Sequence, residues 1–253
     1  MKRIITYTVL LFVALVARGA ETSSAEHWEA GNRAYSSREY ATAIAEYNAI
    51  LEGGEYSLEL YYNLGNAYFK ADSLGKAILY YNKALRIDPS QEDVIHNLAF
   101  AELRTTDKVA ETPEFILSRW VRGVRDMLSC NVWSILSLVA LALLLIFALI
   151  FLLASAIGVR KASFFGALCA LIFGIATTAF AISSRNNMLE HNEAIVMASA
   201  VSIKSSPDLS ATDLFVLHEG TKVRIVETVD EWCEVVLADG KKGWIEDKNI
   251  EEI

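Results

Sequence analysis

The residue types that most often perform chemistry are few in this chain, and they are dispersed. The four histidines fall in three separate segments: His27, His96, His191 and His218. The three cysteines form no CxxC pair and suggest no disulfide: Cys130, Cys169 and Cys233. The chain also lacks P-loop, HExxH and GxSxG motifs. The sequence therefore predicts no catalytic residue, no metal ligand, no cofactor and no enzymatic activity.

A hydrolase acting on an envelope substrate would need an activated cysteine or histidine. Cys233 is considered for this role because it lies outside the hydrophobic runs. It falls within a predicted strand, and the sequence places no histidine to activate it. Apolar filling is the favoured interpretation of this residue. We therefore expect the chain to bind rather than to catalyse.

Apolar residues are concentrated in particular parts of the chain. They make up 53% of its 253 residues, and the longest runs cover 4–17, 132–157 and 162–182. Two small polar domains and a membrane region therefore share the chain. The net charge of −8, with fifteen acidic and eight basic residues in 21–112, argues against nucleic acid or anionic lipid as a partner of the polar domains.

The N-terminal residues 1–20, MKRIITYTVLLFVALVARGA, have the pattern of a signal peptide: a basic start, an apolar core and small residues at the end. Cleavage could follow Gly19, Ala20 or Ala25. Because Arg18 interrupts the usual small-residue pattern, an uncleaved anchor is the alternative. Either interpretation predicts export of the following segment.

An internal repeat follows. AGNRAYSSREYATAIAEY at 30–47 matches LGNAYFKADSLGKAILYY at 64–81 with an offset of 34 residues, and NLAFAELR at 97–104 begins a third copy. Small residues at Gly31, Gly65 and Ala99 would let the paired helices of each unit pack closely. The second copy resembles the tetratricopeptide repeat at most signature positions: Tyr61, Leu64, Gly65, Tyr68, Ala77, Tyr81, Ala84 and Pro89. We predict an all-α array of two repeats and a partial third over 21–111.

Such arrays bind proteins on a concave face lined by the first helix of each unit. The residues predicted to bind protein there are Trp28, Asn32, Tyr62, Asn63, Asn66 and Asn97. The asparagines could bond a peptide backbone, or they could simply belong to the repeat scaffold. The basic residues of a carboxylate clamp are replaced by Trp28, Asp93 and Asn97, which makes a free carboxylate tail a doubtful ligand. So short an array also needs cover at its ends, from a partner or the membrane.

Residues 112–130 predict an amphipathic helix, capped by Thr112 with Pro113 in its first turn. Its apolar face is opposed by Arg119, Arg122 and Arg125. We expect it to lie in the membrane interface, with its arginines toward lipid headgroups. The alternative is a helix that caps the array.

Two transmembrane helices are predicted at 131–157 and 162–182, joined by GVRK. Neither contains an ionisable residue, so transport by this chain alone is not expected. Small residues recur every fourth position in the second helix: Gly166, Ala170, Gly174 and Thr178. That stripe could face the first helix or another membrane protein. Export of the N-terminus would place both polar domains outside. The count of basic residues around the helices does not support this orientation, but an interfacial helix accounts for three of the arginines, so we follow the export signal.

The C-terminal residues 190–253 show the period-two alternation of short strands, with a hairpin turn at Asp239 and Gly240. The order VSIKSSP, LHEGTKVRIVE and EWCEVVLADGKKGWI resembles a bacterial SH3 domain, a small all-β barrel. Trp232 and Trp244 could line a groove for peptide or cell wall. The alternative is that both side chains belong to the core or its rim.

The order of these parts resembles the BatE family, the tetratricopeptide proteins of the Bacteroidetes aerotolerance (Bat) operon. The resemblance implies an inner-membrane protein whose partners include von Willebrand A domain Bat proteins. The export signal implies that its repeat and SH3-like domains lie in the periplasm. We expect a multidomain membrane protein acting as a non-enzymatic scaffold in aerotolerance or envelope stress. The alternative is an anchor that binds peptidoglycan through its SH3-like domain.

Overall fold

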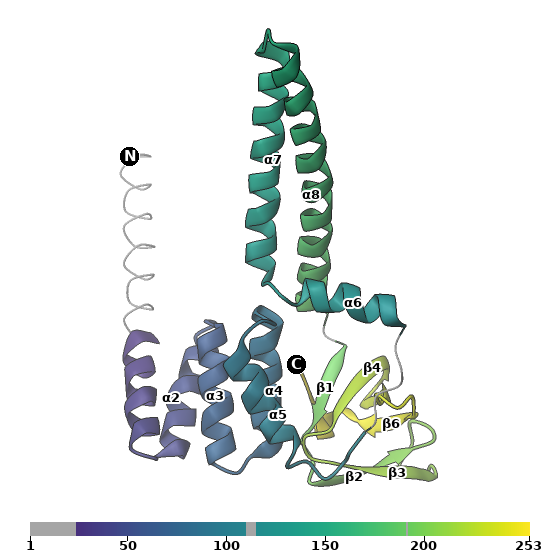
Figure 1. Ribbon diagram of the computed structural model, residues 1–253. Helices are drawn as coiled ribbons and strands as arrows, with labels where there is room; N and C mark the ends of the chain where they lie inside the picture. The colour runs from purple at the N-terminus through teal and green to yellow at the C-terminus, as the bar shows by residue number, and fades with distance from the viewer. Residues whose placement is uncertain (1–23, 110–114, 191) are drawn as a thin grey trace, which may run out of the picture. The chain divides into compact units, whose positions relative to one another are not determined.

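A computed structural model describes residues 24–109, 115–190 and 192–253 (Figure 1). The predicted signal peptide, Thr112, Pro113 and His191 lie outside the described residues. The described chain forms two compact units. One holds most of the helical array and the C-terminal β-domain, and the other holds a long apolar hairpin, its neighbouring segments and residues 85–95. The predicted fold class is confirmed in all three parts: helical repeats, two apolar helices and an antiparallel β-domain.

The array consists of antiparallel helix pairs. Residues 24–36 pair with α2 (Tyr40–Glu52), α3 (Leu58–Lys70) pairs with α4 (Leu74–Ile87), and α5 (Glu92–Glu102) begins the third unit. Glycine permits the closest contacts, since a Cβ added at Gly31 or Gly65 would lie 2.5 Å from Tyr47 or 2.6 Å from Tyr81. Each glycine thus holds a tyrosine of its partner helix against the backbone, as the repeat requires.

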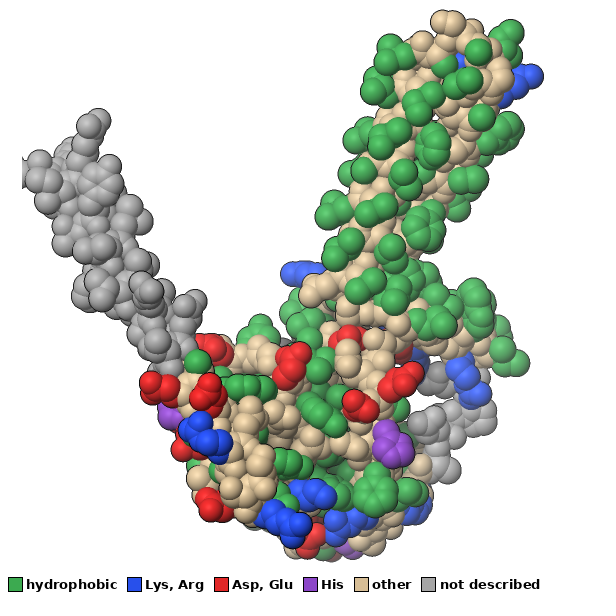
Figure 2. Space-filling view, turned by 60° about the vertical axis from the view of Figure 1, so that its left-hand side comes forward, with side chains coloured by type: hydrophobic (Ala, Val, Ile, Leu, Met, Phe, Trp, Pro, Cys, Tyr) green, Lys and Arg blue, Asp and Glu red, His purple; other side chains and the backbone are tan. Residues whose placement is uncertain are grey.

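The second unit contains α6 (Ile116–Arg125), α7 (Cys130–Leu153) and α8 (Ile157–Leu189). The last two are long and apolar enough to cross a membrane, with mean hydropathies of 3.2 and 2.2. Hydrophobic side chains gather along both helices in Figure 2. The sequence places their connection at 158–161, whereas α8 already begins at Ile157. The four residues GVRK therefore form its first turn, and the chain reverses at 154–156.

The small-residue stripe of α8 faces α7. A Cβ added at Gly166 would lie 2.9 Å from Phe147, and Gly174 lies over Ala140. The hydroxyl groups of Ser137 and Thr178 are 2.6 Å apart. Of the two partners considered for this stripe, the described structure therefore places the first apolar helix against it.

The C-terminal domain is a seven-stranded antiparallel sheet in the order β3-β2-β6-β5-β4-β1-β7. The strands are β1 (Glu193–Val196), β2 (Ala200–Lys204), β3 (Asp213–His218), β4 (Lys222–Val229), β5 (Trp232–Val236), β6 (Lys242–Glu246) and β7 (Ile250–Glu252). The predicted turn joins β5 and β6, with Gly240 at a φ of 87°. Alternate residues such as Cys233, Val235 and Ile245 fill the core.

Candidate functional site

A groove of about 450 Å³ lies along the first helices of the array. Its lining combines aromatic and polar side chains from three repeat units and the second helix of one of them: Tyr35, Tyr62, Asn66, Phe69, Lys70, Tyr81, His96, Asn97 and Phe100. A lining of aromatic rings and hydrogen-bonding side chains can hold an extended segment of a protein.

Asparagine and tyrosine side chains form a hydrogen-bond ladder that repeats with the array. Tyr81 Oη donates to Asn66 Oδ1 at 2.8 Å, and Asn97 Nδ2 donates to the same oxygen at 2.9 Å. One repeat earlier, Tyr47 Oη and Asn63 Nδ2 donate to Asn32 Oδ1 at 2.7 and 3.4 Å. Burial raises the pKa of Tyr81, which keeps its hydroxyl a donor. The ladder therefore fixes which way each amide points.

This fixed orientation decides what the groove can offer a ligand. Both lone pairs of Asn66 Oδ1 are occupied, so Asn66 can present only its Nδ2 donor. Asn97 Nδ2 donates to Asn66 and, at 3.1 Å, to Tyr62 Oη. Asn97 can therefore present only its Oδ1 acceptor. One donor and one acceptor on neighbouring helices match the carbonyl and amide groups of an extended peptide.

Three of the six residues predicted for the concave face line this groove: Tyr62, Asn66 and Asn97. Asn32 and Asn63 belong to the preceding rung of the ladder. Trp28 packs on the array core, with its ring 5.8 Å from that of Tyr47. These bonds give the asparagines a scaffold role, and among the described residues they leave one group each on Asn66 and Asn97 for a ligand.

Six further residues line the groove that the sequence pattern did not predict: Tyr35, Phe69, Lys70, Tyr81, His96 and Phe100. A signal for several of them was present in the repeat. The 34-residue offset relates Tyr35 to Phe69, Tyr62 to His96 and Asn66 to Phe100. Following the predicted positions Tyr62 and Asn66 into the next repeat would have found His96 and Phe100.

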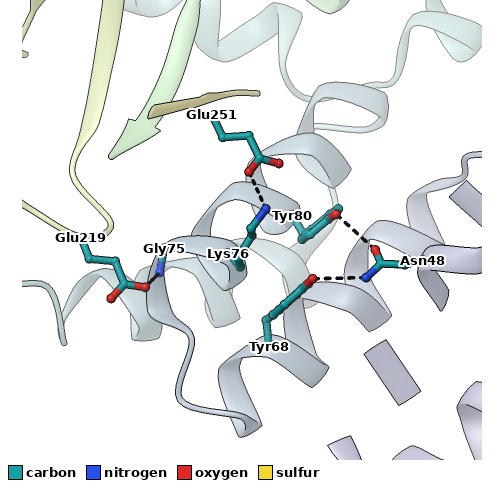
Figure 3. Close-up of polar contacts among 7 residues, drawn as sticks. All are labelled: Asn48, Tyr68, Gly75, Lys76, Tyr80, Glu219 and Glu251. Carbon is teal, nitrogen blue, oxygen red and sulfur yellow. Dashed lines mark hydrogen bonds and ion pairs between the residues drawn. The ribbon is translucent and has the colours of Figure 1, made fainter. Parts of the chain in front are cut away.

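A second feature of this unit is the contact between the array and the β-domain (Figure 3). Glu219, in the turn between β3 and β4, accepts a 2.7 Å hydrogen bond from the backbone N–H of Gly75 in the first turn of α4. That amide has no acceptor within its own helix, and a carboxylate also suits the positive end of a helix dipole. Lys76 and Glu251 form an ion pair beside it. The β-domain thus caps α4 from 144 residues away.

Asp107, which follows the array, fastens the same contact. Its carboxylate accepts hydrogen bonds from the backbone N–H of His218 and the hydroxyl of Thr221, both at 2.7 Å, and lies 2.8 Å from His218 Nδ1. Burial alone would raise the pKa of Asp107, but these hydrogen bonds outweigh it and hold the pKa below its usual value. Val109 then packs against the β-domain core.

The β-domain takes the place of a further repeat beside α4. In α2, Asn48 bonds Tyr68 and Tyr80 of the next unit at 3.3 and 3.5 Å (Figure 3). Asn82 occupies the equivalent position of α4, and its Oδ1 accepts from Lys222 of the β-domain at 3.3 Å. The cover that the sequence assigned to a partner or the membrane comes here from the chain's own C-terminus.

Trp232 and Trp244 lie on the outer face of the sheet, half-buried. Trp244 pairs with Glu234 and Trp232 with Glu246 in the β5–β6 register, which makes the two indoles diagonal neighbours. The array contacts come from the β3–β4 turn, β4 and β7. The two tryptophans therefore belong to a different surface of the β-domain.

The candidate nucleophile has the properties of a packing residue. Cys233 is 2% exposed, and burial raises the pKa of its thiol. His27 and His218 lie 2.7 and 2.8 Å from carboxylates in separate places. Within the described ranges, no cluster of three or more His, Cys, Asp or Glu side chains could hold a metal ion.

Comparison with protein families identifies two modules. The tetratricopeptide repeat family matches residues 58–91, which cover α3 and α4. The bacterial SH3 domain family matches residues 199–251, which cover β2 to β6 and the first two residues of β7. A comparison with curated proteins finds no match. Both matched modules are typically non-catalytic interaction domains, so protein binding is the activity that they suggest.

Proposed function

We propose that this protein is a membrane-anchored, non-enzymatic scaffold that binds an extended segment of a partner protein in the groove of its repeat array. The observation that carries the proposal is the pair of oriented amides, with the Asn66 donor beside the Asn97 acceptor. Asparagines whose other groups are already bonded lose little side-chain entropy when a ligand binds. The ladder thus prepares the groove for a peptide backbone.

The groove lining also favours certain partner side chains. Phe69 and Phe100, with ring centroids 5.7 Å apart, offer an apolar surface, and Lys70 is the basic residue of the lining. We infer a segment that carries an apolar or aromatic residue and a nearby acidic one. A single lysine does not make the clamp that a C-terminal carboxylate needs, so an internal segment fits better than a free tail.

The resemblance to the BatE family suggests which proteins supply that segment. We propose the other Bat proteins, including those with von Willebrand A domains, in aerotolerance or envelope stress. The predicted export signal and the apolar hairpin support a location in the bacterial inner membrane, with the array and β-domain in the periplasm. The signal peptide remains a prediction from residues 1–20.

Phe100→Asp tests this function. Phe100 is 54% exposed, so the variant should fold, but it places a charge in the apolar part of the groove. We expect co-purification of the von Willebrand A domain partner from crosslinked membranes to fall about tenfold, the effect of about 1.4 kcal/mol. The matched control is Leu209→Asp, because Leu209 is 71% exposed and lies in a loop of the β-domain. Equal loss, or no loss, in both variants would contradict groove binding.

Peptidoglycan binding is a second candidate function, and the two indoles on one outer face of the β-domain favour it. Aromatic faces of this kind can stack on sugar rings. We expect the full chain in detergent to sediment with purified sacculi, and Trp244→Ala to weaken this at least fivefold. Leu214→Ala, at a residue of the same domain that is 50% exposed, should bind normally. Equal sedimentation of both variants would rule out the tryptophan face.

A further inference from the structure

An exposed apolar face runs along α6, between the array and the apolar hairpin in sequence. Its side chains are hydrophobic and exposed: Ile116 at 83%, Trp120 at 65%, Leu117 at 59% and Val121 at 43%. At about 100° per residue they fall within an arc of about 140° around the helix. Arg119, Arg122 and Arg125 lie on the opposite side. So strong a separation, in a helix with no buried residue, indicates a surface that needs a partner.

The structure attaches this helix to the foot of the apolar hairpin. Only residues 126–129 separate α6 from α7, and Trp133 Nε1 donates a 2.9 Å hydrogen bond to the carbonyl oxygen of Arg125. Trp133 itself is 8% exposed and packs on Phe180 of α8. In Figure 1, α6 runs across the foot of the hairpin rather than along it.

These observations point to one occupant of the apolar face. A helix held crosswise at the end of two membrane-length apolar helices is placed where acyl chains meet headgroups. We propose that α6 lies on an anionic phospholipid surface, with Trp120 and its apolar neighbours among the acyl chains and its arginines at headgroup phosphates. Arg125 already pairs with Asp126 at 2.6 Å. Arg119 is therefore the residue to which we assign anionic-lipid selectivity.

The inference is independent of the groove and adds a lipid-dependent contact to the proposed scaffold. Arginine suits this position because its long stem lies along apolar surface while its guanidinium reaches a phosphate. Contact with headgroups also explains why three arginines precede the first apolar helix, whichever way the helices cross the membrane.

The full chain in nanodiscs provides the test. Trp120 fluorescence is obtained as the difference between the wild type and Trp120→Phe, in phosphatidylcholine alone and in an equal mixture with phosphatidylglycerol. We expect brominated acyl chains to quench Trp120 and aqueous iodide to leave it unquenched. Quenching by the brominated chains should be more complete in the anionic discs. Arg119→Gln should lower the ratio of inserted to exposed α6 about fivefold in anionic discs, and less than twofold in phosphatidylcholine.

Arg160→Gln is the matched control, since Arg160 lies in the first turn of α8 at the other end of the hairpin. It should leave Trp120 quenching unchanged. Protection of Trp120 from both quenchers would mean that protein covers the face, and iodide access in both lipids would mean that nothing does. Equal insertion in both lipids would remove the anionic selectivity. Each of these three results would overturn the proposal.

Discussion

Gly220 provides a sharp test of the contact between array and β-domain. Its φ of 86° is left-handed, and a Cβ added there would lie 2.9 Å from both Ile78 Cδ1 and Thr105 Cγ2. Gly240 has a φ of 87°, but an added Cβ would meet no atom within 4 Å. Alanine therefore has the same conformational cost at both sites. Only at Gly220 does it add a steric cost.

The structure allows the two costs to be separated. Gly240→Ala should destabilise the β-domain by about 1 kcal/mol, because alanine disfavours the left-handed region. Gly220→Ala adds about 2 kcal/mol for overpacking, since Ile78 is only 1% exposed and has little room to move. That additional cost falls on the contact with the array. It corresponds to about a thirtyfold change in the equilibrium between docked and undocked states.

Hydrogen exchange at the Gly75 amide reports on this equilibrium. Its acceptor is Glu219 of the β-domain, and as a first-turn amide it has no acceptor within α4. In full-length protein in nanodiscs, we expect Gly220→Ala to accelerate exchange at Gly75 about thirtyfold. Gly240→Ala should change it less than threefold.

Equal rates at Gly75 in the two variants would refute the reasoning, because they would mean that the array does not depend on the β-domain for cover. Protection of the β5 amides from hydrogen exchange shows that a variant is folded, and both variants should retain it.

The remaining predictions concern the array core, the docking carboxylate and the buried thiol. Gly65→Ala should lower the free energy of unfolding of the array by about 2 kcal/mol in urea titrations, because its Cβ would lie 2.6 Å from Tyr81. Gly123→Ala should not lower it, because an added Cβ there would meet no atom within 4 Å. An unchanged free energy of unfolding in Gly65→Ala would contradict the close packing. Because the folded pKa of Asp107 lies below its usual 3.8, its carboxylate stabilises the fold fully above that value and progressively less as pH falls through the folded pKa. The difference in unfolding free energy between wild type and Asp107→Asn should therefore shrink from about pH 5 to pH 2; a difference independent of pH would contradict this. Cys233 should resist iodoacetamide until urea unfolds the β-domain, and rapid labelling of the native protein would contradict its burial.

The repeat array was predictable because its physical requirements recur with the period. Close approach of the paired helices requires a glycine opposite each tyrosine, at Gly31 and Gly65. The 34-residue offset repeats this glycine from one unit to the next. The face of the asparagines was predictable in the same way. Their hydrogen-bond partners were not, because a ladder between Asn66 and Asn97 depends on how two helices pack.

The contact between array and β-domain left no signal in the sequence. Glu219 and Gly75 are 144 residues apart, and neither residue type departs from the pattern of its own module. Long-range docking depends on surface shape, which composition and periodicity do not encode. The turn of the apolar hairpin was also predicted at the wrong residues. Arg160 and Lys161 look like loop residues, but they lie within α8.

The most direct test of the central claim, that the groove holds a partner segment, is photo-crosslinking in intact cells from a benzoylphenylalanine at position 100. We expect mass spectrometry to map the adduct to one internal segment of a von Willebrand A domain protein of the envelope, with an acidic residue close to an apolar one. The same probe at position 209 should give no such adduct. Adducts with the same protein from both positions, or none from position 100, would contradict the account.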